Sequence, residues 1–342
     1  MKNNKIWILL SVLIILIVII TVPLGIKMKY KQDEPHTHNM LSSSNQDPFK
    51  EESALVRAPG SSNYITADVI SPNPENMTLT YNGSPILVTY QFQCEKPCTM
   101  GLMIYVNGIL QPYTITATGE ETNMHTVEMG AEDTQQFGFE FTPVCGEKGD
   151  KLVVIFANVY NAKIIELTGD INTFGNNQKI SQPHPWTLQL NADSIKKEFN
   201  IATDYQTNTF SEEDKSNFVR IDRDGNRRNQ LDNNCYIDIR QNQQVLSSRI
   251  AMNHFVDNKL ELYIYGNLTG KYRVSLYGDF DPLTINGQDY VEINVKKGEY
   301  TVIPFTLSAA DAGRYKNVFA ILAPMEFQNA LSKSSSLYLM DK

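Results

Sequence analysis

From residue 64 onward, hydrophobic and polar residues alternate with a period of two, in short runs separated by turn residues. Such alternation is typical of strands that bury one face, and clusters of Gly, Pro, Asn and Asp between runs are typical of tight turns. We therefore expect an all-β fold, with one short helix at 194–199. The candidate strands of the first half are residues 64–70, 77–81, 86–93, 99–106, 113–118, 126–129, 137–142, 152–160 and 186–190.

The N-terminus departs from this pattern. Residues 6–26 carry no charge, and 17 of these 21 positions are apolar. A helix of this length spans roughly 30 Å, the thickness of a bilayer core. A cleaved signal peptide is the nearest alternative, but its apolar region is usually about 7–15 residues long and ends in small residues, which are missing here. We interpret residues 6–26 as an uncleaved transmembrane anchor after a cytoplasmic tail, residues 1–5.

Residues 27–62 are polar and have no hydrophobic period, which predicts a flexible linker. A coil of 36 residues has an end-to-end distance of roughly 30–36 Å. Lysines flank both ends of the anchor, so the positive-inside rule does not set its orientation. Because only five residues precede the anchor, and because a disulfide is expected in the body, we expect a single-pass cell-membrane protein whose C-terminal body is extracellular.

The strand pattern repeats along the chain. Adding 172 to the residue number carries Tyr64 onto Tyr236, Val88, Tyr90 and Phe92 onto Leu260, Leu262 and Ile264, and Met100, Leu102, Ile104 and Tyr105 onto Tyr272, Val274, Leu276 and Tyr277. Smaller offsets pair Pro112 with Pro282, Phe141 with Phe305, Phe156 with Phe319 and Leu188 with Leu337. A steadily shrinking offset is expected when loops shorten in a duplicated domain. Chance pairing of two β-rich stretches is the alternative.

These features predict two tandem antiparallel β-sandwich domains, at residues 63–192 and 235–342, joined by a polar interdomain connection at 193–234. In the length and spacing of its candidate strands alone, each half resembles the immunoglobulin-like modules of bacterial membrane-anchored surface proteins. The resemblance carries no family motif, and the strand Trp flanked by two core Cys is missing, since Trp186 is the only Trp outside the anchor. Because β-sandwich proteins have many unrelated functions, the resemblance implies a fold and not a function.

Charge restricts the possible partners. The chain has 30 Lys and Arg against 38 Asp and Glu, a net charge of −8, and five of the basic residues lie at or before Lys31. The body beyond Lys31 therefore carries a net charge of −13. A body this acidic is a poor ligand for phosphate backbones, so we expect no nucleic-acid partner.

The sequence contains none of the common catalytic or nucleotide-binding motifs, and we expect no cofactor and no metal. The few candidates have simpler interpretations. His36 and His38 lie in the linker, and His125, His184 and His254 suit packing or surface positions. Residues 222–226 start like a calcium loop, but the glycine falls at position 4 instead of 6, which favours a tight turn. The pair Asp279 and Asp281 is interpreted as a strand terminus.

Four cysteines leave room for one or two disulfides. Cys94 and Cys98 fall at the ends of two successive candidate strands, and the offset of 172 carries them onto Gly266 and Gly270. We expect residues 94–98 to form a hairpin turn closed by a Cys94–Cys98 bridge. Cys145 and Cys235 are left open: each is free, or they pair across the domain interface.

The sequence therefore favours a non-enzymatic surface protein, whose two sandwiches present loops or a strand edge to a protein partner at the cell surface. The alternative is an extracytoplasmic carbohydrate-binding accessory, with exposed tyrosines as its platform, or a hydrolase with a site built from loops. A concave pocket with several converging polar groups would favour the alternative.

Overall fold

The computed structural model describes residues 56–57, 64–72, 76–162, 178–181, 184–211, 219–221, 227–229, 234–246, 256–327 and 329–339. The chain divides into two compact units, Met1–Lys50 and Glu51–Lys342, and every described residue belongs to the second. Within the described ranges no helix is long and apolar enough to cross a membrane. The predicted anchor at residues 6–26 lies outside these ranges, so it stays a prediction.

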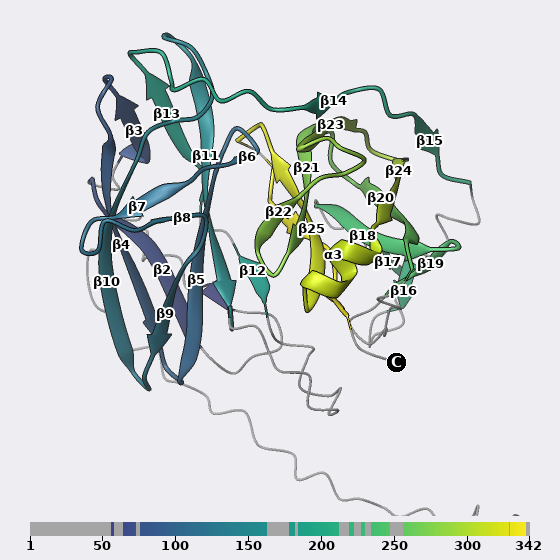
Figure 1. The fold of residues 1–342 in the computed structure, drawn as a ribbon, viewed down its shortest axis with the longest axis horizontal. Coiled ribbons are helices and arrows are strands. Elements are labelled where there is room, and N and C mark those ends of the chain that lie inside the picture. Colours follow the sequence, from purple (N-terminus) through teal and green to yellow (C-terminus); the bar gives the residue numbers. More distant parts are fainter. Residues whose placement is uncertain are drawn as a thin grey trace, which may run out of the picture. The chain divides into compact units, whose positions relative to one another are not determined.

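The described residues form an all-β fold, and the strands of its first half make two sheets (Figure 1). Sheet A has the order β1 (Val56–Arg57), β2 (Tyr64–Ser71), β4 (Ile86–Cys94), β10 (Asp133–Phe141), β7 (Tyr113–Ile115) and β8 (Glu121–Thr122). Sheet B has the order β3 (Thr78–Tyr81), β13 (Trp186–Leu190), β11 (Lys151–Tyr160), β5 (Cys98–Val106) and β6 (Ile109–Leu110); in addition, β9 (His125–Met129) pairs with β5 and β12 (Lys179–Ser181) with β11.

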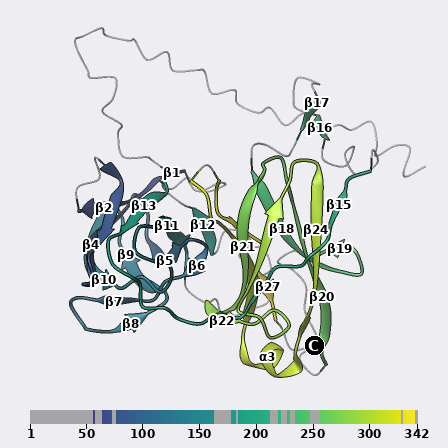
Figure 2. The ribbon, with the colours of Figure 1, turned by 90° about the horizontal axis from the view of Figure 1, so that it is seen from above.

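The second half repeats this arrangement in two further sheets (Figure 2). Sheet C has the order β14 (Ile201–Ala202), β23 (Tyr290–Val295), β21 (Gly270–Gly278), β25 (Asn317–Pro324) and β26 (Ser332–Lys333), with β22 (Asp281–Leu283) on β21 and β27 (Leu337–Tyr338) on β25. Sheet D has the order β15 (Thr207–Thr209), β24 (Glu299–Leu307), β20 (Asn258–Gly266), β18 (Cys235–Gln241) and β19 (Gln244–Val245). β16 (Val219–Ile221) and β17 (Arg227–Asn229) form a separate ribbon, and α3 (Ala309–Arg314) precedes β25.

The duplication predicted from the sequence agrees with the strand bounds. Both bounds of β20 are those of β4 shifted by the predicted offset of 172, and the same holds for β21 and β5. The bounds of β24 are likewise those of β10, shifted by a smaller offset. The partners correspond as well, because β4 lies between β2 and β10 just as β20 lies between β18 and β24. The two halves therefore share the order of these central strands, whereas their outer strands differ. The predicted domain boundaries remain a prediction.

Each half encloses its own core between its two sheets. The first core includes Phe92 of sheet A and Phe156 of sheet B, and the second includes Leu262 of sheet D and Val274 of sheet C. β4 alternates between buried and exposed residues, as a strand with one solvated face does. β5 and β25 instead bury every residue. Sheets B and C are therefore covered on both faces.

The outer faces of sheets B and C cover each other through a third apolar cluster, which we call the joint. It is composed of Met103, Tyr105, Leu110, Val153, Ile155, Ala157, Val159 and Ala162 from the first half and Tyr277, Phe280, Phe319, Ile321 and Ala323 from the second. At its centre the Tyr105 hydroxyl donates to the Tyr277 hydroxyl over 3.1 Å. The Arg273 guanidinium donates to the carbonyl oxygen of Asn107 over 2.7 Å.

The predicted helix at 194–199 is wrong, because this stretch forms no helix. It runs as an extended segment from β13 to β14 (Figure 1). Its backbone bonds explain the difference: the N–H groups of Ile195 and Lys197 donate to the carbonyl oxygens of Pro143 and Val144, over 3.0 and 3.2 Å. A helix would instead satisfy its N–H groups within its own turns. We call residues 193–200 the connector, since they link β13 of the first half to β14 of the second.

Candidate functional site

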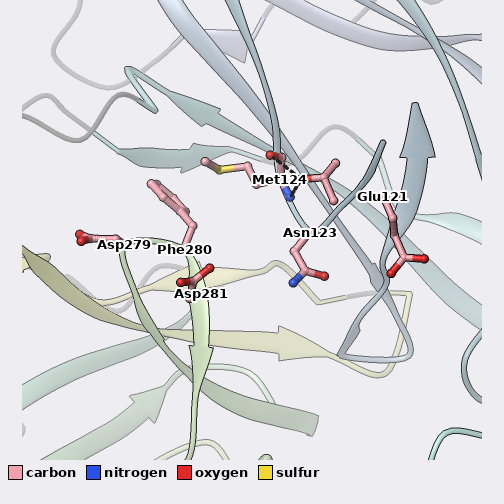
Figure 3. Close-up of a pocket in the computed structure, with 7 residues that line it drawn as sticks. Glu121, Asn123, Met124, Asp279, Phe280 and Asp281 are labelled. Carbon is pink, nitrogen blue, oxygen red and sulfur yellow. Dashed lines mark hydrogen bonds between the residues drawn. The ribbon is translucent and has the colours of Figure 1, made fainter. Parts of the chain in front are cut away.

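A cleft of about 330 Å³ lies between the segment that contains β8 and the turn from β21 to β22. Glu121, Thr122, Asn123 and Met124 line it on one side, and Asp279, Phe280 and Asp281 on the other (Figure 3). Three of the seven lining residues are acidic. None is a histidine, a cysteine or a lysine.

Asp279 has a structural role in this cleft, because it binds backbone N–H groups. Its carboxylate accepts hydrogen bonds from the backbone N–H groups of Lys316 and Asn317, at 2.9 and 3.0 Å. Burial raises the pKa of Asp279, and these two bonds act in the opposite direction. As the sequence predicted, the Asp279–Asp281 pair falls at a strand terminus, since β21 ends at Gly278.

Phe280 is held in the left-handed region, with φ of 75° after Asp279 at 47°. Two consecutive positive φ values are typical of the tight hairpin turn that favours Asn-Gly, and the equivalent turn in the first half is Asn107-Gly108, at 50° and 78°. A bulky residue at such a φ is strained, so packing must offset the cost. Phe280 is only 4% exposed, and its ring centroid lies 5.1 Å from that of Phe319.

The cleft lacks a catalytic arrangement. Figure 3 shows the carboxylates of Glu121, Asp279 and Asp281 pointing in different directions, whereas acid–base pairs converge on one reacting group. In the described part of the chain, no group of three or more His, Cys, Asp or Glu residues is placed to hold a metal ion.

Two neighbouring hollows, of about 280 and 160 Å³, extend the cleft into a groove. Glu121 lines both the cleft and the larger hollow, Asn123 lines both the cleft and the smaller one, and Pro112 and Lys197 line both hollows. We call the three together the acidic groove. Its acidic residues are Glu121, Glu140, Glu198, Asp279, Asp281 and Asp289, against one basic residue, Lys197. Such a lining attracts cationic side chains.

The connector borders this groove and, although it belongs to no strand, offers an open backbone edge. In an extended chain, successive N–H groups point to opposite sides. Those of Ile195 and Lys197 are bonded to residues 143 and 144, so those of Lys196 and Glu198 face the other way. Among the described residues, neither of these two N–H groups forms a backbone hydrogen bond. Ile195, which lines the groove, is 62% exposed.

The predicted hairpin between Cys94 and Cys98 is wrong. β4, which ends at Cys94, pairs with β2 and β10 in sheet A, whereas β5, which begins at Cys98, pairs with β11, β6 and β9 in sheet B. The turn between the two cysteines therefore crosses from one sheet to the other. Period-two alternation marks both strands correctly, but it does not say whether successive strands pair with each other or lie in facing sheets.

Cys94 and Cys98 are free thiols in the structure, and both belong to the first core. Burial raises the pKa of Cys98 to about 12, and the neighbouring Cys94 adds to this rise through repulsion and a hydrogen bond. The two thiols are thus neighbours across the rim of the sandwich. In the second half the equivalent residues are glycines, and a Cβ at Gly270 would clash with the Asn329 side-chain nitrogen.

The Cys94–Cys98 bridge stays a prediction. If the body meets an oxidising compartment, we expect non-reducing peptide mapping to find these two cysteines linked and two hydrogens lighter, and Cys98→Ser to abolish the linked peptide. The closed loop is short, so its stabilisation should fall below the roughly 3 kcal/mol expected for a 15-residue loop. A peptide that links Cys94 or Cys98 to Cys145 would contradict the assignment.

Cys145 and Cys235 are also free thiols. Cys145 packs against the first core and Cys235 lies inside the second. Burial raises the pKa of Cys145 to about 11, and Arg273 of the second half acts in the opposite direction. Since the two thiols belong to different cores, the structure does not bring them together as a pair.

Of the five histidines, the structure describes His125 and His184, and neither belongs to a group placed to hold a metal ion. The ring of His125 lies 4.8 Å from that of Phe137, and burial lowers its pKa, as expected for a packing residue. His184 is exposed just before β13. His36, His38 and His254, together with the loop 222–226, lie outside the described residues.

Tyrosines gather on the outer face of sheet D, a feature that the sequence alignment could have revealed. The offset that relates the two halves carries Gln91 and Gln93 of β4 onto Tyr263 and Tyr265 of β20. The Tyr263 ring stacks on Tyr300 at 4.9 Å, and the Arg240 guanidinium lies 3.4 Å from its centroid. Tyr300 and Arg240 belong to the strands on either side of β20, so they cover the two faces of the Tyr263 ring. A sugar would need one of these faces to stack on Tyr263.

No family model matches this chain, and no curated protein matches its sequence. Several solved structures show weak likeness. The Caenorhabditis elegans MSP family member WR4 is 16% identical over 37% of this chain and 96% of its own, with a TM-score of 0.18. The Salmonella enterica SafA pilin–SafB chaperone structure is 9% identical (80% and 96% covered, TM-score 0.22). The Escherichia coli chaperone DraB is 9% identical (81% and 97%, TM-score 0.23). At such scores these likenesses carry no argument about function.

Proposed function

We propose that this chain is a non-enzymatic interaction protein of the cell surface. In this proposal the anchor at residues 6–26 holds it in the membrane with the body outside. The acidic groove and the open edge of the connector then receive an extended, basic segment of a protein partner. The coarse assignment rests on an all-β fold whose cleft has no catalytic arrangement. The anchor rests on the uncharged apolar run, and the outside position of the body rests on the expected Cys94–Cys98 bridge.

The observation that carries the proposal is the connector itself. It is extended, one edge is fixed to residues 143–144, and the other edge presents the N–H groups of Lys196 and Glu198. An edge of this kind pairs with an added strand, whose main chain supplies hydrogen bonds and whose side chains supply specificity. The neighbouring carboxylates favour Lys and Arg on that strand. Two of the six, Asp279 and Asp289, already accept backbone N–H groups, which leaves Glu121, Glu140, Glu198 and Asp281 for a partner.

The test removes one edge donor. Lys196→Pro eliminates the outward N–H while the bonds from Ile195 and Lys197 remain possible. The matched control, Lys196→Ala, keeps the N–H but loses the same exposed 2.6 Å ion pair with Glu147. On intact cells, a photo-crosslinker in place of Ile195 should trap a partner protein. We expect about fivefold weaker trapping with the proline and little change with the alanine, because one hydrogen bond contributes about 1 kcal/mol.

Equal trapping by the two variants would contradict the proposed edge. High salt should weaken trapping, since the attraction between the groove and basic side chains is screened. Labelling of the body on intact cells by a membrane-impermeant reagent tests the membrane placement separately. Protection of the body until lysis would overturn the location without affecting the edge.

A further inference from the structure

The joint is built from equivalent positions of the two halves. In sheet B, Tyr105 lies opposite Ile155, and in sheet C its equivalent Tyr277 lies opposite Phe319. The next outward-facing pair follows the same rule: Met103 lies opposite Ala157, and its equivalent, the buried Ser275, lies opposite Ile321. Each half therefore contributes the same patch of its sheet.

One pair lies on an axis of approximate twofold symmetry. Tyr105 and Tyr277 are equivalent residues of the two halves, and their hydroxyls bond to each other at 3.1 Å. In a symmetric pair of subunits, only a residue at the twofold axis meets its own equivalent. The contact is therefore of the isologous kind, in which one patch recognises a second copy of itself.

Away from the axis, each half sets the turn after its central strand against the central strand of the other half. In one of these two equivalent contacts the large residue is on the strand, and in the other it is on the turn. A Cβ at Gly108 would lie 3.0 Å from the Arg273 side chain. The equivalents of these two residues are Phe280 and Gly101, so the large residue is now on the turn and the small one on the strand. A Cβ at Gly101 would lie 3.2 Å from the sulfur of Met124, which lines the cleft together with Phe280. The two sides have therefore diverged in which element carries the large residue.

We infer that the joint is a self-complementary docking surface, of the kind that joins two copies of one subunit. Its occupant is the complementary half of this chain, and the mixing step below supplies that half from a second copy. The connector is not needed to hold the halves together. Residues before Glu198 form hydrogen bonds with the first half, and residues after it with the second. The Ser194 hydroxyl donates to the Gly146 carbonyl, and the Asn200 N–H donates to the Asp289 carboxylate. The inference does not depend on the acidic groove.

The experiment cuts the connector in the folded full chain. A protease recognition sequence is inserted after Glu198, and the protein is purified in detergent and cleaved. We expect the two halves to co-elute in size-exclusion chromatography at the volume of the uncut chain. Ile155→Asp, which places a charge in the joint, should separate them after cleavage. The matched control is Leu87→Asp on the outer face of sheet A, where the side chain is 62% exposed.

A mixing step tests recognition between copies. Cleaved protein with a C-terminal affinity tag is unfolded and refolded with an equal amount of untagged, isotope-labelled cleaved protein. The tag should retrieve first halves of both isotopes in about equal amounts. Separation of the halves on cleavage, or retrieval of no first half after refolding, would overturn the inference. If Ile155→Asp does not fold, Phe280→Gly removes a ring from the joint without adding charge, and should separate the cleaved halves at lower denaturant than the unsubstituted protein.

Discussion

Phe156→Ala is expected to destabilise the protein by about 3–5 kcal/mol, the usual cost of removing a buried aromatic ring. Phe156 is fully buried in the first core. Its ring centroid lies 5.7 Å from that of Tyr90, 6.4 Å from Phe139 and 6.0 Å from Trp186. Rings from both sheets thus surround the position, and they are too tightly held to refill the space, so a cavity would remain.

Equilibrium unfolding in urea, read by tryptophan fluorescence of Trp186, measures this effect directly. The matched control is Leu87→Ala, whose side chain is 62% exposed on the neighbouring sheet and should change the free energy of unfolding by about 0.5 kcal/mol or less. A loss below about 1 kcal/mol for Phe156→Ala would show that the ring is not enclosed as described.

The sequence pairings at the smaller offsets are all wrong. The registers pair Pro282 with Leu110, Phe305 with Phe139 and Leu337 with Trp186, each two residues from the predicted partner. The fourth error concerns Phe156. An offset of 163 pairs it with Phe319, but the registers make Ala320 its equivalent, because Ile104 lies opposite Phe156 and Leu276 opposite Ala320. Phe319 instead faces the joint. The error has a physical origin: β25 buries every residue and β11 all but its first, so neither shows the alternation that fixes which side chains point inward.

Where one face of a strand is solvated, the sequence predicts well. β4 and β20 have the expected offset and phase, since each alternates over most of its length. The pairing of strands is not predictable in the same way, which is why a hairpin at Cys94–Cys98 fits the sequence but not the structure. The acidic groove combines Glu121, Glu198 and Asp281, which are far apart in the sequence. No local pattern indicates that such residues meet, because their proximity depends on how the two halves pack.

Lys333→Met is expected to stabilise the protein near neutral pH and to change its pH dependence. The Lys333 ammonium donates to Ser336 Oγ over 2.7 Å and to the Ser334 carbonyl over 3.2 Å, and it lies 4.4 Å from the ring centroid of Phe319. Among the described residues no carboxylate forms an ion pair with it, and the neighbouring strand β12 contributes another cation, Lys179. Burial lowers the pKa of Lys333 from 10.5 to about 7.

The sign of the pH effect follows from proton binding. Between pH 7 and 10.5 the unfolded chain keeps the lysine proton and the folded chain releases it, so the free energy of unfolding rises with pH. From pH 7.0 to 8.5, Lys333 alone should contribute a rise of about 1.5 kcal/mol. The thiols of Cys98, Cys145 and Cys235, whose pKa burial raises, act in the opposite direction because they ionise first in the unfolded chain. They do so in every variant, so the lysine contribution is the difference between the unsubstituted protein and Lys333→Met. Lys333→Met should remove this rise, whereas Lys259→Met, on an exposed position of β20, should keep it. If urea unfolding of Lys333→Met at these two pH values shows the same difference as the unsubstituted protein, Lys333 is not the titrating group, and its ammonium must be reached by water that keeps its pKa near the ordinary value.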